Sequence, residues 1–364
     1  MINCLSIPKL TYLLSSAPCF KCKEELEEFD TAIKMNTEKI SNAAFGKNSW
    51  SQASLPIRFA TDQSLPCFLS SSFACQGLVN RLLPSLTLPH GEVINATDAW
   101  SALRDSSPRQ KETQSAWDDP SCRDSLAALL DTPSPWNHCR LLTTQKSHTA
   151  AWLEAFPIAS VGTLLSPDEL RITITLRTGA NIFESTECRC GKFVDRLGLH
   201  SLSCIKNAGR FPRHLAINSV LKRSLTRIGL PSVLEPVGLT KDRRPDGLTL
   251  NPWYRCRSLV WDATVVDSFA ESHYTVSGAI PGSVATDAET AKCRKYNDLL
   301  DNHFIQPVAI ETTGVYGKST APFLNCLANK LVDILGDPRE RQCLHQRLSL
   351  AVVRGNTASI LACV

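Results

Sequence analysis

The clearest helical pattern in the chain lies between residues 211 and 231. Pro212 occupies a position suited to the first turn of a helix, and Gly229 followed by Pro231 supplies a stop. The apolar residues between them fall near helical spacing: Phe211, Leu215, Val220, Leu221, Leu225 and Ile228. The pattern therefore predicts a helix over 212–228.

Two continuous apolar runs downstream predict buried strands, over 259–266 and 307–312. The segment 287–300 between them has a helical pattern, as do 324–335 and the last twenty residues. The resulting order of helix, strand, strand, helix and strand predicts a small α/β or α+β core.

The N-terminal half gives weaker patterns. The first sixty residues have a helical pattern that includes Leu5–Leu14 and Thr31–Ala44, whereas 61–150 is rich in Ser, Pro and Thr and predicts short helices joined by irregular loops. The segment 168–176 fits a helix that ends near Gly179, but its β-branched residues fit a strand equally well.

The composition indicates an ordinary globular chain of two or three domains: 364 residues, 43% hydrophobic and 20% charged. Fifteen cysteines are an odd number, and no signal peptide precedes them, so we expect a reducing, intracellular compartment, nuclear or cytoplasmic. No apolar run approaches the ~18 to 20 residues of a membrane span, so no membrane partner is expected.

Positive charge is concentrated in one segment. Between Arg189 and Arg257 there are fourteen Lys or Arg residues and four acids, although the net charge of the whole chain is only +4. Such asymmetry is typical of a surface that binds a polyanion, and nucleic acid is the main candidate. The alternative is a solvated basic face with no ligand.

Four Cys and His residues at the start of this basic segment have the spacing of a metal site: Cys188, just before it, and Cys190, His200 and Cys204 within it. Their pattern, C-x-C-x9-H-x3-C, supplies four ligands of the kind that tetrahedral zinc prefers, so a structural zinc ion is predicted. The alternative is a set of buried thiols without a metal.

Basic and polar residues follow at the start of the predicted helix. We expect them to contact the phosphates of a nucleic acid, with Asn218 able to orient a neighbour. The candidate nucleic-acid-binding residues are Arg210, Arg213, His214, Asn218, Lys222 and Arg223, together with Arg244 and Tyr296 further on.

Two aspartates supply candidate catalytic carboxylates. Asp246 lies in the sequence Arg244-Pro245-Asp246-Gly247, and Asp262 lies within the apolar strand 259–266, where an unpartnered carboxylate is costly. Carboxylates on adjacent strands can share a Mg²⁺ ion, which positions water and stabilises charge on a phosphodiester. The alternative for Asp246 is an ordinary Pro-Asp-Gly turn.

A nuclease of this kind also needs a cation near the scissile phosphate. Thr264 occupies the usual position, two residues after the second acid, so Lys292 and Lys295 on the following helix are the candidates. The alternative is that both are ordinary exposed lysines. Glu235 is a candidate third carboxylate, and Glu311 is a weaker one.

Taken in order, these motifs resemble the C-terminal region of non-LTR (LINE-type) retrotransposon proteins that carry a restriction-like endonuclease. That region has a CCHC zinc knuckle, an Arg-His-Asn element, a Pro-Asp with a distant Asp, and a Lys-Tyr helix. Ile7–Leu14 and Ser51–Pro56 resemble the thumb and post-polymerase segment of the same proteins, so the resemblance extends over nearly the whole chain.

The resemblance implies five parts. They are a thumb remnant over 1–60, a helical linker over 61–180, a zinc knuckle over 181–210, a PD-(D/E)xK endonuclease core over 211–320 and a helical segment over 321–364. It implies DNA as the partner, with RNA as a second candidate, and no small-molecule substrate.

The chain departs from the family pattern in ways that limit its activity. It has no Tyr-x-Asp-Asp or Phe-Ala-Asp-Asp motif, so DNA synthesis is excluded, and Ala60-Thr61-Asp62 stands where a glycine-rich stretch is expected. The main hypothesis is a metal-dependent, target-nicking DNA endonuclease fragment. The alternatives are a catalytically inactive zinc-dependent remnant that binds nucleic acid and an open reading frame whose product never accumulates.

Overall fold

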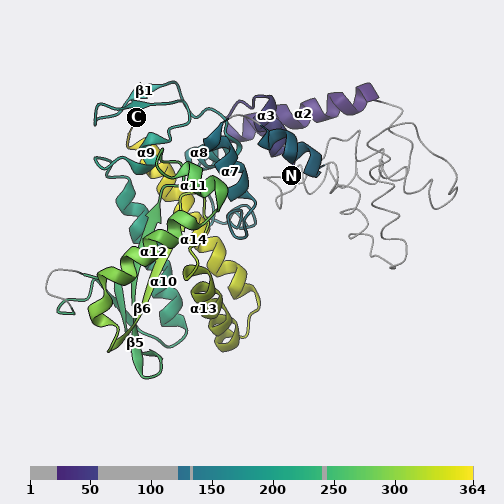
Figure 1. Ribbon diagram of the computed structural model, residues 1–364. Helices are drawn as coiled ribbons and strands as arrows, with labels where there is room; N and C mark the ends of the chain where they lie inside the picture. Colours follow the sequence, from purple (N-terminus) through teal and green to yellow (C-terminus); the bar gives the residue numbers. More distant parts are fainter. Residues whose placement is uncertain (1–22, 56–121, 132–133, 240–243, 364) are drawn as a thin grey trace. The chain divides into compact units, whose positions relative to one another are not determined.

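The computed structural model describes residues 23–55, 122–131, 134–239 and 244–363, which belong to two units, 1–132 and 133–364 (Figure 1). The first unit contains α2 (Lys23–Ser41), α3 (Lys47–Ala53) and a helix over 122–130. The predicted helix over 31–44 is confirmed as far as Ser41. The helical pattern at Leu5–Leu14 and the loops predicted between residues 61 and 121 lie outside the described residues.

A four-stranded sheet organises the second unit. Its strands are β3 (Ser232–Leu234), β4 (Gly247–Tyr254), β5 (Arg257–Val266) and β6 (His303–Glu311), in the order β3-β4-β5-β6. The first three strands run antiparallel, whereas β5 and β6 are parallel, with Asp262 opposite Pro307.

The parallel pair of strands requires a crossover connection, which consists of α11 (Tyr274–Ala279), α12 (Ser283–Lys295) and the 3₁₀ turn η3 (Asn297–Leu299). A mixed fold of helices and sheet, as predicted, is therefore confirmed for this unit.

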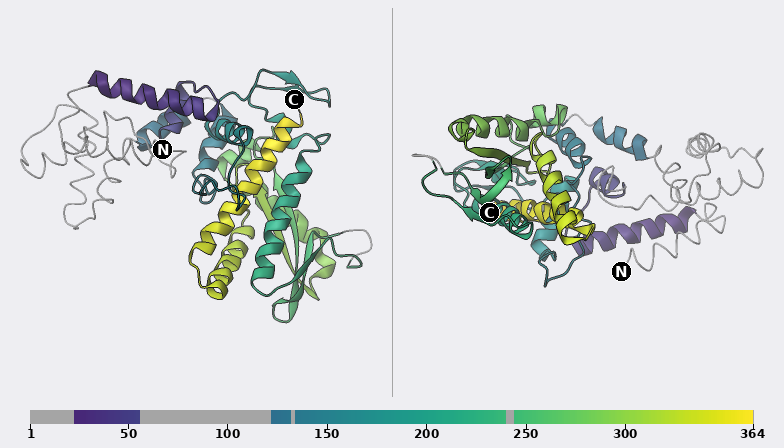
Figure 2. Two further views of the ribbon diagram at one scale, coloured as in Figure 1. Left: turned by 180° about the vertical axis from the view of Figure 1, so that it is seen from behind. Right: turned by 90° about the horizontal axis from the view of Figure 1, so that it is seen from below.

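The two faces of the sheet pack against different helices. One face, with Leu259, Trp261 and Ala263, packs against α10 (Arg210–Arg227), α13 (Thr320–Leu335) and α14 (Arg339–Leu361), which lie across the sheet in the left view of Figure 2. The other face packs Val260 against Tyr296 and Leu299, at the end of α12 and in η3. Because side chains alternate along β5, Asp262 points to the α12 face.

A small residue allows α10 and α14 to cross closely. A Cβ atom on Gly355 would lie 2.2 Å from Cβ of Arg213, a separation that atoms do not reach. The guanidinium of Arg213 donates at 2.8 Å to Oδ1 of Asn356, the next residue of α14. The C-terminal helix is thus bound to the helix that carries His214.

Residues 168–176, whose sequence fits a helix and a strand equally well, form a helix, α8 (Pro167–Thr178). It follows α7 (Pro135–Thr144). Its start is capped reciprocally: Ser166 Oγ accepts from the Glu169 N–H at 3.2 Å, and the Glu169 carboxylate accepts from the Ser166 N–H at 2.8 Å. Gly179, with φ of 70°, ends the helix. These end signals outweigh the strand preference of the β-branched residues between them.

Other predicted boundaries shift by a few residues. The helix predicted over 212–228 is α10, which begins at Arg210, so Pro212 is its third residue rather than its first. The helix predicted over 287–300 begins at Ser283 and gives way to η3 after Lys295, and the strand predicted over 307–312 begins at His303. In the described part of the chain, no helix has the length and hydropathy that crossing a bilayer requires.

Candidate active site and metal cluster

Asp246 lies where the ladder between β4 and β5 ends. Its N–H donates to the carbonyl of Trp261 at 3.0 Å, and the next residue, Gly247, is paired with Trp261. A Cβ atom on Gly247 would lie 2.0 Å from the indole ring, so only glycine fits against this tryptophan. Beyond this pair, Oδ2 of Asp246 accepts from the N–H of Ala263 at 2.6 Å. The carboxylate therefore accepts the bond that the N–H of Ala263 on β5 would otherwise donate to a backbone carbonyl of the neighbouring strand.

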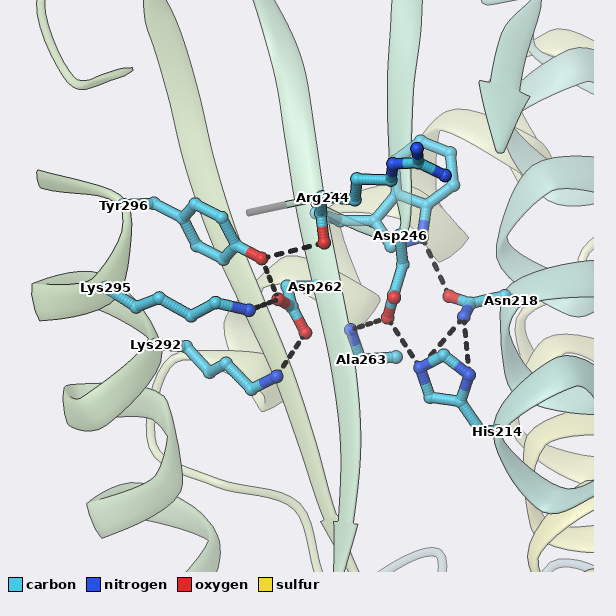
Figure 3. Close-up of polar contacts among 10 residues, drawn as sticks. His214, Asn218, Arg244, Asp246, Asp262, Ala263, Lys292, Lys295 and Tyr296 are labelled. Atoms are coloured by element: carbon cyan, nitrogen blue, oxygen red, sulfur yellow. Dashed lines mark hydrogen bonds and ion pairs between the residues drawn. The ribbon is translucent and has the colours of Figure 1, made fainter. Parts of the chain in front are cut away.

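His214 on α10 bonds to the same carboxylate oxygen. Its Nε2 lies 2.8 Å from Oδ2 of Asp246 (Figure 3). Asn218, one turn further along α10, has its side-chain nitrogen 3.3 Å from that imidazole nitrogen, and its Oδ1 accepts from the indole N–H of Trp261 at 3.0 Å. Asn218 thus lies between the imidazole and the buried tryptophan, and its amide oxygen is held by the indole N–H.

Asp262 is approached from the opposite side, by residues at the end of α12. Lys292 Nζ lies 2.5 Å from Oδ1, and Tyr296 Oη donates to Oδ2 at 2.5 Å, with Lys295 Nζ 3.4 Å from the same oxygen. The tyrosine hydroxyl also lies 3.0 Å from the carbonyl oxygen of Arg244. The side chain of Asp262 is only 4% exposed, so these partners compensate for the cost of burying its charge.

The His214–Asp246 pair shifts the pKa of both groups. The hydrogen bond that His214 donates to Asp246 is the main cause that raises the pKa of His214 above its ordinary value of 6.5, although burial opposes it. Burial alone would raise the pKa of Asp246, but the bond and charge of His214 and the Ala263 N–H outweigh it and lower that pKa below 3.8. Both shifts favour the charged form of the pair, imidazolium against carboxylate.

The structure brings together most of the predicted catalytic residues. Asp246 lies immediately before β4 and Asp262 lies within the neighbouring strand β5, with Lys292 and Lys295 beside Asp262 (Figure 3). Glu235 contacts this group of residues through its backbone, because its N–H donates to the carbonyl of Asp246. Its side chain is exposed.

Glu311, the weaker candidate for a third carboxylate, does not join this group. It is paired with Val266, four residues further along β5 than Asp262. Its carboxylate is buried against the hydroxyl of Ser268 and the N–H of Gly282.

Three of the predicted nucleic-acid-binding residues are buried and need a different role. Arg213 is 3% exposed and donates to Asn356 and to the carbonyl of Leu202, while Asn218 and Tyr296 are bound to Trp261 and Asp262. A phosphate cannot reach them, so they orient neighbours instead. The remaining predicted contacts lie at or near the surface: Arg210, Arg223 and Arg244 are exposed, and His214 and Lys222 are half-buried.

The four predicted metal ligands converge around a small hairpin, β1 (Thr186–Glu187) with β2 (Phe193–Val194), and the short helix α9 (His200–Ser203). Their ligand atoms all lie within 4.8 Å of one another, so Cys188, Cys190, His200 and Cys204 could hold a metal ion. The Sγ atoms of Cys188 and Cys204 are 3.7 Å apart, close to the about 3.8 Å that two bonds of about 2.3 Å to a tetrahedral zinc ion would give.

The hairpin prepares one of the thiols to bind a cation. The backbone N–H of Cys190, as the main cause, lowers the pKa of Cys188 to about 6, although burial opposes this. Gly191, with φ of 82°, allows the tight turn in which its N–H donates to the carbonyl of Cys188 at 2.7 Å. The donor set and its spacing fit a metal ion that prefers thiolate and imidazole ligands.

Sequence reasoning missed two residues around these sites. The apolar pattern of the strand assigns Trp261 no role beyond packing, although its indole N–H positions Asn218. A tryptophan beside an acid in a buried strand is the signal that indicates such a role. Cys363, whose Sγ lies 3.5 Å from that of Cys188, is 159 residues beyond Cys204, and no local spacing relates the two.

Comparison with known proteins found no matching family model and no significant match among curated proteins. The function of the chain is therefore inferred from the geometry of these two sites.

The charged His214–Asp246 pair predicts a specific pH dependence. Because its pKa is raised, His214 stabilises the fold fully below pH 6.5, and this contribution is lost as the pH rises through its folded pKa. Asp246 contributes above pH 3.8 and loses its contribution as the pH falls through its own lowered pKa. An NMR titration without added divalent cation should place the midpoint of His214 above 6.5.

In Asp246→Asn the same titration should shift to lower pH, because burial then acts on the imidazole without its counter-charge. An unchanged midpoint in that variant would contradict the assigned pair.

Proposed function

We propose that this chain is a Mg²⁺-dependent DNA endonuclease of the restriction-like class. The observation that carries the proposal is the placement of Asp246, immediately before β4, next to the strand β5 that carries Asp262, with two lysines beside Asp262 and an imidazole bonded to Asp246 (Figure 3). Carboxylate pairs flanked by cations suit the hydrolysis of a phosphodiester, whose charge increases in the transition state.

Asp246 and Asp262 would hold the Mg²⁺ ion, since both offer the oxygen ligands that this cation prefers. When bound, the ion would activate water and stabilise charge on the phosphate. Lys292, already 2.5 Å from Asp262, would place its ammonium near the scissile phosphate, while Tyr296 holds the carboxylate in position. His214, whose charged form is favoured by its pairing with Asp246, would be suited to donate a proton to the leaving oxygen.

The order of elements supports the restriction-like class. A helix, three antiparallel strands, a crossover helix and a parallel strand follow one another as α10, β3, β4, β5, α12 and β6. This order accommodates the PD-(D/E)xK core that the motif resemblance implies, with Asp246 before β4 and Asp262 within β5. We further propose, on the same resemblance, that the chain derives from the C-terminal part of a non-LTR retrotransposon protein.

A second function, a catalytically inactive module that binds nucleic acid, is favoured by one specific observation. Both oxygens of Asp262 already accept hydrogen bonds, from Lys292 and from Tyr296, and Asp246 is paired with His214. A metal ion would have to share or displace these partners. The same network could serve as a structural element beneath a basic surface.

Nicking of supercoiled plasmid separates the two functions. With Mg²⁺ at low salt, the intact chain should convert supercoiled plasmid to the open circle. Asp246→Asn with Asp262→Asn should reduce the rate by about 100-fold or more, since removal of metal ligands costs more than the 10- to 100-fold typical of their supporting residues. DNA binding should persist.

Asp287→Asn is the matched control, because Asp287 is an exposed acid on α12 and its substitution should leave nicking unchanged. Retained DNA binding without nicking by the unsubstituted chain, in Mg²⁺ or Mn²⁺, would favour the inactive module.

We also propose that the metal held by Cys188, Cys190, His200 and Cys204 is a structural zinc ion. Mass spectrometry under native conditions should find one zinc per chain, and Cys188→Ser with Cys204→Ser should abolish its binding and lower the thermal midpoint. Cys326→Ser, which removes an exposed cysteine, serves as the control. Zinc-free protein with an unchanged midpoint would contradict the structural role.

A further inference from the structure

A groove lies directly beside the His214–Asp246 pair. Its floor includes Thr264 and Val265, from the part of β5 that extends past the end of the β4 ladder and pairs only with β6. Its walls come from the start of α10 and from the segment after Cys204. The groove encloses about 380 Å³, within the range of sites that bind small organic groups.

Apolar side chains are exposed along this groove. Ile205 is 88% exposed and Phe211 is 71% exposed, and both line it. Leu215, one turn after Phe211 on α10, is 58% exposed and extends the same strip. A cluster of exposed apolar residues beside polar ones is typical of a surface that binds a ligand.

The charge of the groove identifies the ligand class. Of its lining residues, Arg210 is an exposed cation and His214 is half-buried, and none of the described residues that line it is an acid. Lys206 is exposed next to Ile205. Cations next to an exposed aromatic ring are the combination that binds single-stranded nucleic acid, since phosphates meet the charges while a base stacks on the ring.

A continuous duplex fits this arrangement poorly. In a duplex both faces of each base are covered by neighbouring bases, so Phe211 has no base face to contact. An unpaired nucleotide presents one, and the groove has the volume to receive it.

We propose that this groove binds an unpaired nucleotide of DNA, with its base stacked on Phe211 and its phosphates near Arg210 and Lys206. The substrate is then DNA with a single-stranded segment next to the cleavage site. The assignment of substrate rests on the proposed nuclease function, whereas the binding site itself does not.

The test uses binding rather than cleavage, with the full chain carrying Asp246→Asn and Asp262→Asn. The probe is a duplex with a short single-stranded bubble that contains 2-aminopurine, a fluorescent base whose emission falls on stacking. Addition of protein should quench the probe more than it quenches a fully paired duplex with the same label. Adding Phe211→Ala should abolish the quenching and weaken binding about 5- to 150-fold, equivalent to about 1 to 3 kcal/mol for one stacked base.

Two further variants make the result specific. Phe193→Ala removes an aromatic residue that is 70% exposed on β2 and does not line the groove, so it should leave the quenching unchanged. Phe211→Trp should restore quenching, because it replaces one aromatic ring with another.

Equal quenching by Phe211→Ala would overturn the proposal, as would equal binding of bubble and duplex. A bubble of RNA that binds more tightly than the DNA bubble would overturn the assignment of DNA. If the unsubstituted chain fails to nick plasmid but the quenching depends on Phe211, the nuclease function fails and the nucleotide site stands.

Discussion

The contact between Trp261 and Gly247 determines where the two carboxylates lie. The indole ring fills the space that a side chain at residue 247 would need, and it is fully buried against α10, α13 and α14. This contact fixes the register of β4 on β5, so that Asp246, immediately before β4, lies beside the middle of β5. Trp261 packs on the face of the sheet that α10, α13 and α14 cover. Because side chains alternate along a strand, Asp262 points to the opposite face.

Each carboxylate is then supported by a different helix, and both helices are held from elsewhere. Asp246 depends on His214 and therefore on α10, which is bound through Arg213 to α14. Asn207, in the segment before α10, donates to the sulfur of Cys363. Asp262 depends on α12, whose Glu289 accepts bonds from the first N–H groups of α13. The site thus lies between α10 and α12 and depends on the contacts that hold each helix. This explains why Arg213, Asn218 and Tyr296, which were expected to contact nucleic acid, are buried and orient their neighbours instead.

Local signals predicted the elements well, and they predicted the partners of each side chain poorly. The start and stop residues Pro212 and Gly229 predicted the bounds of α10 within a few residues. The apolar run around Val260 predicted those of β5 equally well, because helix ends and buried strands depend on neighbouring residues. The spacing of Cys188, Cys190, His200 and Cys204 predicted a cluster that does converge. The burial of Arg213 could not be predicted, because it depends on Gly355 and Asn356, more than a hundred residues away. The same holds for the bond from Tyr296 to Asp262, which depends on how α12 crosses the sheet.

The proposed nuclease mechanism requires that Asp246 and Asp262 share one divalent cation, which would compete with Lys292 and Tyr296 for Asp262. Crystals of the chain soaked in Mn²⁺ would test this through anomalous diffraction. We expect a peak coordinated by oxygens of both aspartates, with Lys292 moved from Asp262 towards the open side of the site. No peak between the aspartates, with Lys292 and Tyr296 still bound to Asp262, would contradict a catalytic metal site and leave a structural network beneath a nucleic-acid-binding surface.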